Sequence, residues 1–215
     1  MNPQLQNILG QDSIIVQQSM EAISIAFGID KANKYDIFAA NGQKIGTAEE
    51  VSGGAGGFIV RQFLKNSRAC TVQFFDAQGQ VIGQAKKPFR FFFSEMAAIG
   101  DNTEVGNVRR RNLFLRNYTI SVGGIEQFDI QSSLFQWKRF KFDVTRNGVV
   151  VATIAKKFEG FMKMAFTQAD NFSIQFHDKN LTLEERYTLF MTLFLIDFDV
   201  FEQKKWAEWF NLYLE

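Results

Sequence analysis

One stretch near the C-terminus constrains the fold more than any other, because it reads as a helix with almost no polar face. From Tyr187 to Phe201, 11 of 15 residues are apolar. A narrow polar stripe follows one side of this helix: Glu184, Thr188, Thr192, Asp199 and Glu202. Asp197 points to the opposite side. A helix this apolar is enclosed either by protein or by a membrane, and the run is shorter than the roughly 20 residues needed to span a bilayer. We therefore expect a helix at 181–203, N-capped by Asn180, that is wrapped by the rest of the chain.

The chain before this helix carries the sequence signals of β-hairpins. Turn dipeptides separate short apolar runs at Asn41-Gly42, Gln78-Gly79, Gly123-Gly124 and Asn147-Gly148, which is typical of two-residue hairpin turns. The stretch 42–50 resembles 79–87, a weak internal repeat. Apolar and polar residues alternate at 140–144 and 171–176, so one face of each strand is expected to be buried. This pattern predicts mostly antiparallel strands.

The number of strands then predicts the architecture. Residues 12–180 have room for about a dozen strands, at roughly 14 residues for each strand with its turn. A closed barrel of that size has an interior wider than its own side chains fill, and one apolar helix would occupy the space. The 25 phenylalanines would line the gap between helix and strands. We predict a mainly β protein, an antiparallel barrel of about twelve strands enclosing a C-terminal helix. A polar tail at 1–11 precedes the barrel domain, 12–203, and a Trp-rich amphipathic tail at 204–215 follows it.

Composition narrows the functional classes. Cys70 is the one cysteine and His177 the one histidine, which excludes an internal disulfide, a Cys-rich zinc site and a multi-histidine metal centre. The net charge of +1 argues against a nucleic-acid-coating protein. The Gly-rich stretch 52–57 lacks the Lys-Ser/Thr ending of a phosphate loop, so we expect a loop there. Because no nucleophile, metal cluster or acid pair stands out, we predict that the protein is not an enzyme and has no cofactor.

Three C-terminal motifs follow one another with a characteristic spacing: Ile154-Ala-Lys-Lys-Phe-Glu-Gly160, Thr167-Gln-Ala-Asp-Asn-Phe-Ser-Ile-Gln-Phe176 and Phe194-Leu-Ile-Asp-Phe-Asp-Val-Phe-Glu202. In order and spacing they resemble the C-terminal signature of the phospholipid scramblase family. Upstream, Ile14–Gln18, Asn33–Ile37 and Lys87–Arg90 are similar to earlier blocks of that family, so the resemblance covers roughly residues 12–203. The family is related to the tubby C-terminal domain, and the resemblance implies a twelve-stranded barrel around a central hydrophobic helix.

The resemblance also implies an activity. Scramblases move phospholipids between leaflets in both directions without an energy source and in response to calcium, whereas tubby relatives bind phosphoinositide headgroups. The family's calcium segment would place acids at positions 168, 170 and 179, which are Gln168, Asp170 and Lys179 here. Because calcium requires six to eight oxygen ligands, several of them carboxylates, this segment is degenerate even if Asp178 substitutes. The alternative is that Asp170 begins a turn into the last strand.

Basic residues recur at equivalent strand ends and form the candidate lipid site. We call this set the basic rim: Lys86, Lys87, Arg90, Arg109, Arg110, Arg111, Arg116, Lys156 and Lys157. Such a rim would bind phosphate groups, and each basic residue near an anionic membrane adds about 1 kcal/mol. The alternative is that these charges point outward and are neutralised by Glu49, Glu50, Glu95 and Glu104.

Two further candidates remain open. In the C-terminal tail, Trp206, Trp209, Phe210 and Tyr213 share a helical face, which suits a membrane interface but equally suits packing on the barrel, on a second copy or on a partner. Asp197 is either a functional buried acid or a structural one, hydrogen-bonded to strand backbone or to a basic side chain.

These observations predict a phospholipid-associated protein of scramblase type. It would bind anionic phospholipid or phosphoinositide headgroups and take part in transbilayer phospholipid movement. Because residues 1–11 lack the features of a signal peptide, we expect a cytoplasmic protein that associates peripherally with the inner membrane face. The alternative function is an intracellular protein-interaction module that uses the barrel surface and the Trp-rich tail. Nucleic acid is not expected as a partner.

Overall fold

Antiparallel strands make up most of the structure. The computed structural model describes residues 1–19, 33–51, 67, 69–112, 115–131, 141–156 and 171–201. The elements in chain order are α1 (Pro3–Leu9), β1 (Ser13–Gln18), β2 (Lys34–Ala39), β3 (Lys44–Val51), β4 (Cys70–Phe75), β5 (Val81–Lys87), β6 (Glu95–Gly100), β7 (Thr103–Arg110), β8 (Tyr118–Val122), β9 (Ile125–Ile130), β10 (Lys141–Arg146), β11 (Val149–Lys156), β12 (Asn171–Phe176), α4 (Leu183–Ile196) and the π-helix η4 (Asp197–Phe201).

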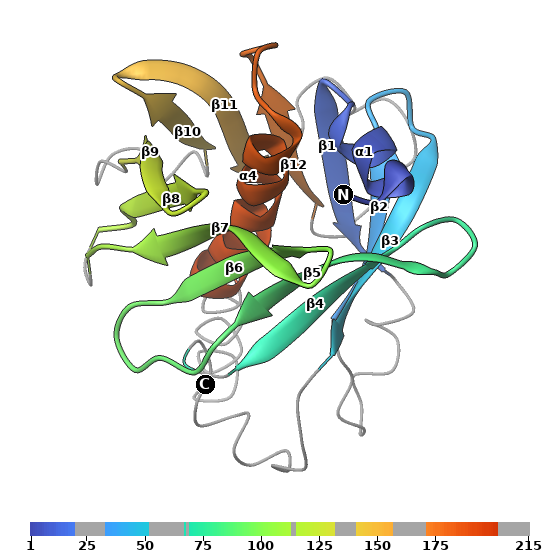
Figure 1. Ribbon diagram of the computed structural model, residues 1–215, viewed down its shortest axis with the longest axis horizontal. Coiled ribbons are helices and arrows are strands. Elements are labelled where there is room, and N and C mark those ends of the chain that lie inside the picture. Colours follow the sequence, from blue (N-terminus) through green and yellow to red (C-terminus); the bar gives the residue numbers. More distant parts are fainter. Residues whose placement is uncertain are drawn as a thin grey trace, which may run out of the picture.

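The twelve strands close into one barrel around a helix. Each strand pairs with its neighbours in sequence, and β1 pairs antiparallel with β12 to complete the ring. Figure 1 shows α4 inside the ring of strands. The prediction of a mainly β, antiparallel barrel that encloses a C-terminal helix is confirmed. Because neighbouring strands are antiparallel throughout, every odd-numbered strand finishes at the same end of the barrel.

The two ends of the barrel differ in their connections. At one end, which we call the turn end, the hairpins β2–β3, β4–β5, β6–β7, β8–β9 and β10–β11 close through short turns. At the opposite end, the loop end, odd-numbered strands finish and the longer connections of the sequence begin. Helix α4 follows β12 at the turn end and runs to the loop end, where η4 continues it.

The predicted hairpin turns are all present, and each hairpin has a bulge beside its turn. At the β10–β11 turn both central residues have positive φ, 51° at Asn147 and 79° at Gly148, the conformation that matches the twist of paired strands. The ladders of all five hairpins shift register next to the turn, as between Val144 and Thr145. Bulges of this kind increase strand twist, which helps a sheet to close on itself.

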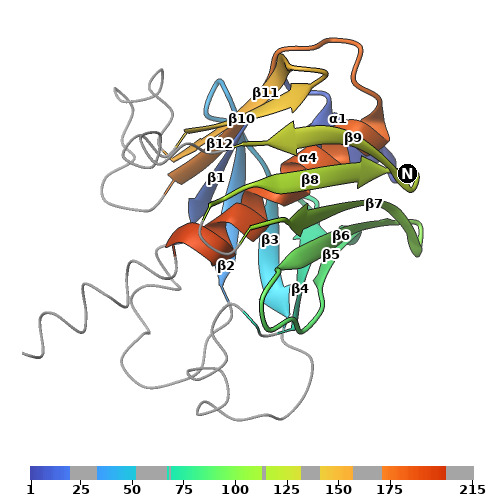
Figure 2. The same cartoon turned by 90° about the vertical axis from the view of Figure 1, so that its left-hand side faces the viewer.

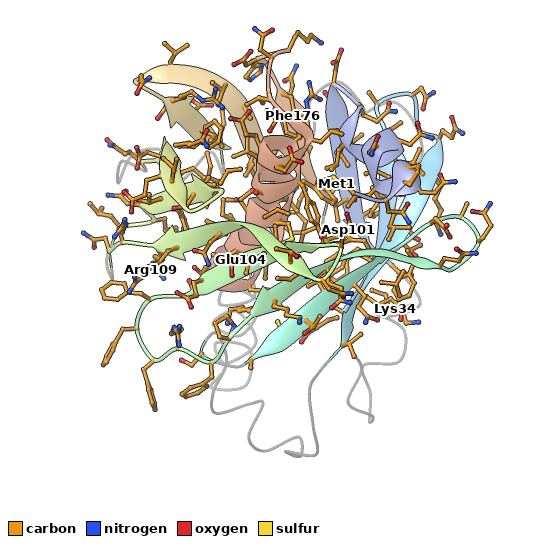
Figure 3. All side chains as sticks on the ribbon, in the orientation of Figure 1. Met1, Lys34, Asp101, Glu104, Arg109 and Phe176 are labelled. Carbon is orange, nitrogen blue, oxygen red and sulfur yellow. The ribbon has the colours of Figure 1, made fainter. Side chains whose placement is uncertain are left out.

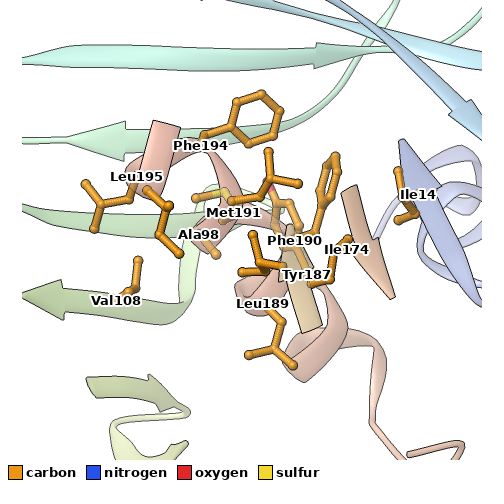
Figure 4. Packing of buried hydrophobic residues seen from close by; sticks show 14 of the residues in the cluster. Ile14, Ala98, Val108, Ile174, Tyr187, Leu189, Phe190, Met191, Phe194 and Leu195 are labelled. Carbon is orange, nitrogen blue, oxygen red and sulfur yellow. The ribbon is translucent and has the colours of Figure 1, made fainter. Parts of the chain in front are cut away.

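Helix α4 is buried by the barrel on every side. Its residues from Glu185 to Ile196 are all buried. Figure 4 shows Tyr187, Phe190 and Phe194 of the helix among side chains of the surrounding strands, such as Ile174 of β12. Phe190 lies 5.4 Å from both Phe74 and Phe194, measured between ring centroids. No helix of the described part of the chain is long and apolar enough to cross a membrane.

The start of α4 corrects one sequence prediction. The N-cap is Thr182 rather than Asn180, because Thr182 and Glu185 form a reciprocal capping box. The Glu185 amide donates to Thr182 Oγ1 at 3.2 Å, and the Thr182 amide donates to Glu185 Oε2 at 2.8 Å. The signal was present as Thr-x-x-Glu. Asn180 instead donates its own amide to the Asp178 side chain at 2.9 Å, in the turn before the helix.

The internal repeat marks where the interior packs most closely against the barrel wall. Gly46 and Gly83 hold the same place in the two similar stretches, and Gly106 holds that place in β7. A Cβ atom at Gly83 would lie 2.7 Å from the Tyr187 hydroxyl, and one at Gly106 would overlap the Thr188 side chain. At Gly83 and Gly106 only glycine leaves room for α4, whereas a Cβ atom at Gly46 would lie 2.8 Å from the Phe75 carbonyl oxygen and 3.0 Å from Ile8 of α1. Glycine is therefore needed at these positions because it has no side chain, and not because of its backbone conformation.

Residues 1–11 correct the expectation of a polar tail. Helix α1 begins at Pro3 and buries Leu5, Ile8 and Leu9 in the core. Their spacing of three and four residues places them on one helical face, which was overlooked among the amides around them. Figure 2 shows α1 beside the first turns of α4, at the turn end. The Arg186 guanidinium donates to the Leu9 carbonyl at 3.0 Å and to the Gln11 carbonyl at 3.2 Å, which ties α1 to the central helix.

Candidate functional site

The outward-facing part of the basic rim gathers at the loop end. Lys86 near the end of β5 and Arg109 near the end of β7 are exposed on the outer face, with β6 between them. Lys86 is level with Ala97 of β6, and Arg109 is level with Glu95 of the same strand. Two strand spacings amount to about 10 Å, and the offset of two residues along the strand adds about 7 Å at right angles, so the two backbone positions are about 12 Å apart. Long basic side chains at that separation share one surface. Arg90, in the loop after β5, and Arg111, directly after β7, are also exposed.

The remaining members of the basic rim lie elsewhere. Lys156 ends β11, four strands beyond β7 in the ring, and its Nζ lies 6.0 Å from the centroid of the Phe172 ring. Lys157 lies outside the described residues. Most described members of the basic rim therefore lie on β5 and β7 or in the segments that follow these strands, whereas Arg116 precedes β8.

Acidic residues neutralise only part of this surface. The Glu95 carboxylate accepts from Arg90, and the Glu126 carboxylate accepts from Arg111. Within the described ranges, Lys86 and Arg109 have no ion pair. Figure 3 shows Arg109 at the outer edge of the barrel and Glu104 further toward the opposite end of β7.

The other three acids that were expected to neutralise the basic rim either have partners outside it or lie far from the loop end. Glu49 pairs with Lys34 at 2.7 Å, and Glu50 accepts from Asn33 at 2.8 Å while buried. Glu104 lies near the turn end of β7. Of the four acids considered from the sequence, Glu95 pairs with a member of the basic rim, Arg90.

Lys87 faces the barrel interior rather than a lipid. Its exposed fraction is 3 %, against an exposed Lys86 beside it, because successive side chains of a strand point to opposite faces. Inside, Lys87 and Arg110 lie near the Asp199 carboxylate, which is 1 % exposed. Basic residues that are adjacent in sequence are thus divided between an outer surface and an inner cluster.

The inner cluster centres on Asp199 of η4. Its Oδ2 accepts from the Tyr118 hydroxyl at 3.1 Å and from the Ser94 hydroxyl. Burial raises the pKa of Asp199, although Ser94, Arg110, Lys87 and Tyr118 each oppose that rise. Burial also raises the pKa of Tyr118 and lowers the pKa of Arg116. These groups tie the end of the central helix to β8 and to the start of β6.

Asp197 makes a hydrogen bond that suits a structural role. The donor is a tyrosine hydroxyl, which the sequence analysis did not name. Its Oδ2 accepts from the Tyr35 hydroxyl of β2 at 2.9 Å. The two acids of η4 are therefore bonded to tyrosines on different strands, Tyr35 on β2 and Tyr118 on β8. On an ideal α-helix, Asp199 would lie on the polar stripe. The π-helical turn changes where residues after Ile196 point, so the bonds of Asp199 to Ser94 and Tyr118 were not predicted.

The described part of the segment similar to the family's calcium site, residues 171–179, extends along the barrel from one end to the other. Asp170 lies outside the described residues. Asn171 begins β12 at the loop end, and Asp178 follows β12 at the turn end, where its Oδ1 accepts from the Asn180 amide. A strand rises about 3.3 Å per residue, so Asn171 and Asp178 are separated by roughly the height of the barrel. In the described ranges no group of three acidic, cysteine or histidine residues is placed to hold a metal ion.

The other sequence candidates are located as follows. Trp206, Trp209, Phe210 and Tyr213 lie outside the described residues. His177 follows β12, and its Nε2 lies 2.9 Å from Thr153 Oγ1.

An exposed aromatic loop was missed. Phe89, Phe91 and Phe92, between β5 and β6, are exposed, although the phenylalanines of the barrel domain were expected to line the gap between helix and strands. The available signal was the run Phe91-Phe-Phe93, because consecutive residues cannot share one face of a strand.

Comparison with known proteins gives one family. A family model described as Scramblase matches residues 1–203. Phospholipid scramblase 2 of Homo sapiens is 27 % identical, over 94 % of this chain and 72 % of its own length. Phospholipid scramblase family member 5 of Homo sapiens is 26 % identical, over 93 % of this chain and 78 % of its own. Altered inheritance rate of mitochondria protein 25 of Saccharomyces cerevisiae is 24 % identical, over 94 % and 74 %.

Among solved structures, an X-ray structure of an Arabidopsis thaliana protein aligns with 87 % of this chain and 91 % of its own. The TM-score is 0.46 and the identity 14 %.

Proposed function

Since this chain belongs to the scramblase family, we propose that it binds anionic phospholipid membranes through the loop end of its barrel. The family membership agrees with the resemblance seen in the sequence. The observation that carries the proposal is the pair Lys86 and Arg109. Both are exposed on one outer face, two strands apart, and neither has an acidic partner among the described residues. Unpaired cations on one face attract an anionic surface at low desolvation cost.

The proposed ligand is the phosphate of an anionic phospholipid or phosphoinositide headgroup. Arg90 and Arg111 extend the same surface, and they form surface ion pairs with Glu95 and Glu126 that an anionic membrane can replace. The names of the human relatives point to phospholipid. Binding would place the protein peripherally on a membrane face, without catalytic chemistry. It would not require calcium, because the segment 168–179 keeps few carboxylates and its described part extends along a whole strand.

Flotation with vesicles tests this proposal. Wild-type protein is expected to float with vesicles that contain phosphatidylserine or a phosphoinositide and not with pure phosphatidylcholine. Binding should fall between low and physiological salt and stay the same with and without calcium. The variant K86E/R109E should bind at least about 30-fold more weakly, since each basic residue contributes about 1 kcal/mol and 1.4 kcal/mol is tenfold.

A charge-matched control separates local from overall charge. K44E/K179E makes the same change in net charge at the turn end, where Lys44 and Lys179 are exposed and paired with Asp36 and Asp12. It should bind as wild type does. Equal losses in the two variants would contradict a site at the loop end. No binding of wild-type protein to any vesicle would contradict the lipid proposal altogether and favour the alternative, a protein-interaction module.

Movement of phospholipid between leaflets is the finer part of the proposal. The family name motivates it, whereas α4 is enclosed by the barrel and shows no membrane-spanning length in the described ranges. Reconstituted vesicles with a fluorescent lipid in both leaflets measure it, through the fraction of dye that dithionite reduces. We expect dithionite to reduce more than half of the dye with wild type and about half with K86E/R109E. If the reduced fraction stays near one half with wild type, the protein binds phospholipid but does not move it between leaflets.

A further inference from the structure

The loop between β5 and β6 presents aromatic rings to solvent at the same end as the cations. We define the Phe loop as residues 88–93. Phe91 is 73 % exposed, Phe92 69 % and Phe89 38 %. A loop that serves only to connect two strands gains nothing from exposing large apolar rings to water. A cluster of exposed aromatics marks a surface that another phase or partner covers.

The rings are held in place by the loop around them. Phe89 and Phe91 meet edge to face with centroids 4.8 Å apart, and Phe91 and Phe92 are 6.4 Å apart. The Arg90 amide donates to the Ser67 carbonyl at 3.1 Å, and the Arg90 guanidinium pairs with Glu95. At the far end of the loop, the Ser94 hydroxyl donates to Asp199 of η4. The structure therefore presents a formed aromatic cluster anchored to the barrel and to the central helix.

We propose that the Phe loop inserts Phe91 and Phe92 into the interfacial region of an anionic bilayer while the neighbouring cations bind headgroups. This proposal rests on the proposed function, because it names the element that makes the loop end bind a membrane surface rather than a dissolved anion. The positive charge around the Phe loop indicates that an anionic bilayer, and not a neutral surface, covers these rings. Lys86 precedes the loop, Arg90 lies within it and Arg109 stands two strands away. Aromatic rings surrounded by cations suit the boundary between anionic headgroups and acyl chains.

Exposed apolar residues at the opposite end have different surroundings. Ile125 and Val149 are each 67 % exposed and follow the turns of the β8–β9 and β10–β11 hairpins. Beside them, three acids line a depression of about 620 Å³: Asp129, Asp143, which pairs with Lys141 at 3.5 Å, and Glu126, which pairs with Arg111. Acids that are paired or in excess do not attract an anionic bilayer. Ile125 and Val149 are therefore controls for Phe91 and Phe92, similarly exposed but beside acids instead of unpaired cations.

Two measurements test the insertion. In flotation with phosphatidylserine vesicles, F91A/F92A is expected to bind about 30-fold more weakly than wild type, from the apolar area withdrawn from water. I125A/V149A should bind as wild type does, and F91W/F92W should keep binding because Trp suits the interface. For depth, F92C in a C70A background carries an environment-sensitive dye. Its emission should shift to the blue on these vesicles and be quenched by nitroxide-labelled lipid, and the dye on V149C should do neither.

The outcomes separate this inference from the proposed function. If K86E/R109E loses binding while F91A/F92A binds as wild type does and the dye on F92C is unchanged, headgroup binding holds and insertion is overturned. If wild type binds no vesicle, the proposed function is overturned and the insertion with it. Binding lost in F91A/F92A without quenching by nitroxide lipid also overturns insertion, because the rings would then act without entering the bilayer. Thermal unfolding of each variant confirms that it is folded.

Discussion

The two ends of the barrel are built from the same kind of strands. They differ in whether their charged side chains form ion pairs and in which apolar side chains are exposed. At the turn end, Lys44 pairs with Asp36 at 2.6 Å, and Lys179 and Arg146 pair with Asp12 and Glu185. Helix α1 covers the first turns of α4 there. At the loop end, the outward-facing cations Lys86 of β5 and Arg109 of β7 have no ion pair among the described residues, and the rings of Phe91 and Phe92 face solvent.

This difference indicates a division of roles along the barrel axis. Contacts that are satisfied within the chain contribute to stability and leave nothing for a ligand. Exposed rings and unpaired cations such as Phe91 and Lys86 contribute little to folding and are available to a partner. We therefore expect substitutions at the turn end to change stability and substitutions at the loop end to change binding.

The largest effect is expected from Leu5→Ala in α1. Leu5 is fully buried and lies close to Gly83 of β5, so truncation should lower the free energy of unfolding by about 2–5 kcal/mol. Phe92→Ala at the loop end should change it by less than about 0.5 kcal/mol. Urea unfolding of the two variants measures the contrast. Equal losses of stability would contradict the division between the ends.

A smaller effect is expected from Thr182→Ala at the start of α4. The substitution removes the hydroxyl that accepts from the Glu185 amide, and loss of an N-cap costs about 1 kcal/mol. Asn180→Ala is the control, since Asn180 precedes the capping box. It should cost clearly less in the same thermal or urea unfolding experiment. A larger loss at Asn180 would show that the helix is capped from the earlier position.

The smallest effect is a difference in pH dependence between the ends. Burial raises the pKa of Asp199 above its ordinary value of 3.8, so the folded state holds this proton more tightly than the unfolded state. Its contribution to stability is complete below pH 3.8 and is lost as the pH rises through the folded pKa. The free energy of unfolding of wild type relative to D199N should therefore decline as the pH rises from about 4.

Asp12 at the turn end should show the opposite sign. Lys179, through its hydrogen bond and its charge, lowers the pKa of Asp12, so that its contribution is present above 3.8 and is lost as the pH falls through the lowered pKa. The free energy of unfolding of wild type relative to D12N should fall toward low pH, and only slightly, because the Asp12–Lys179 pair is exposed to solvent. Urea unfolding between pH 3 and 7 compares the two variants. The same sign of slope at both ends would contradict the assignment.

Much of the fold could be predicted from the sequence because its signals are local. Dipeptides such as Asn147-Gly148 specify hairpin turns through their own backbone preferences. The apolar run of α4 requires an enclosure, and the twelve-stranded ring supplies it. Two predictions were wrong because a stronger neighbouring signal hid the correct one. The amides of residues 1–11 concealed the apolar face of α1, and Asn180 was preferred to Thr182 although the capping box was present.

The candidate site was less predictable, because sequence reasoning grouped residues by charge alone. Lys86 and Lys87 entered the basic rim together, yet the pleat of β5 sends one outward and the other toward Asp199. The aromatic rings of the Phe loop were counted with the core because most phenylalanines belong there. Asp199 was assigned to the regular polar stripe of an α-helix, a position that η4 changes.

The sequence by itself determined the hairpins, the single buried helix and the family, because these depend on residues close together in the chain or on motifs in a fixed order. Only the tertiary structure decided which cations share a surface and which surround a buried acid. Ser94 and Tyr118 reach Asp199 from positions 105 and 81 residues away, and β6 sets the spacing between Lys86 and Arg109. Contacts at such separations arise from the closure and register of the barrel, which no local preference specifies.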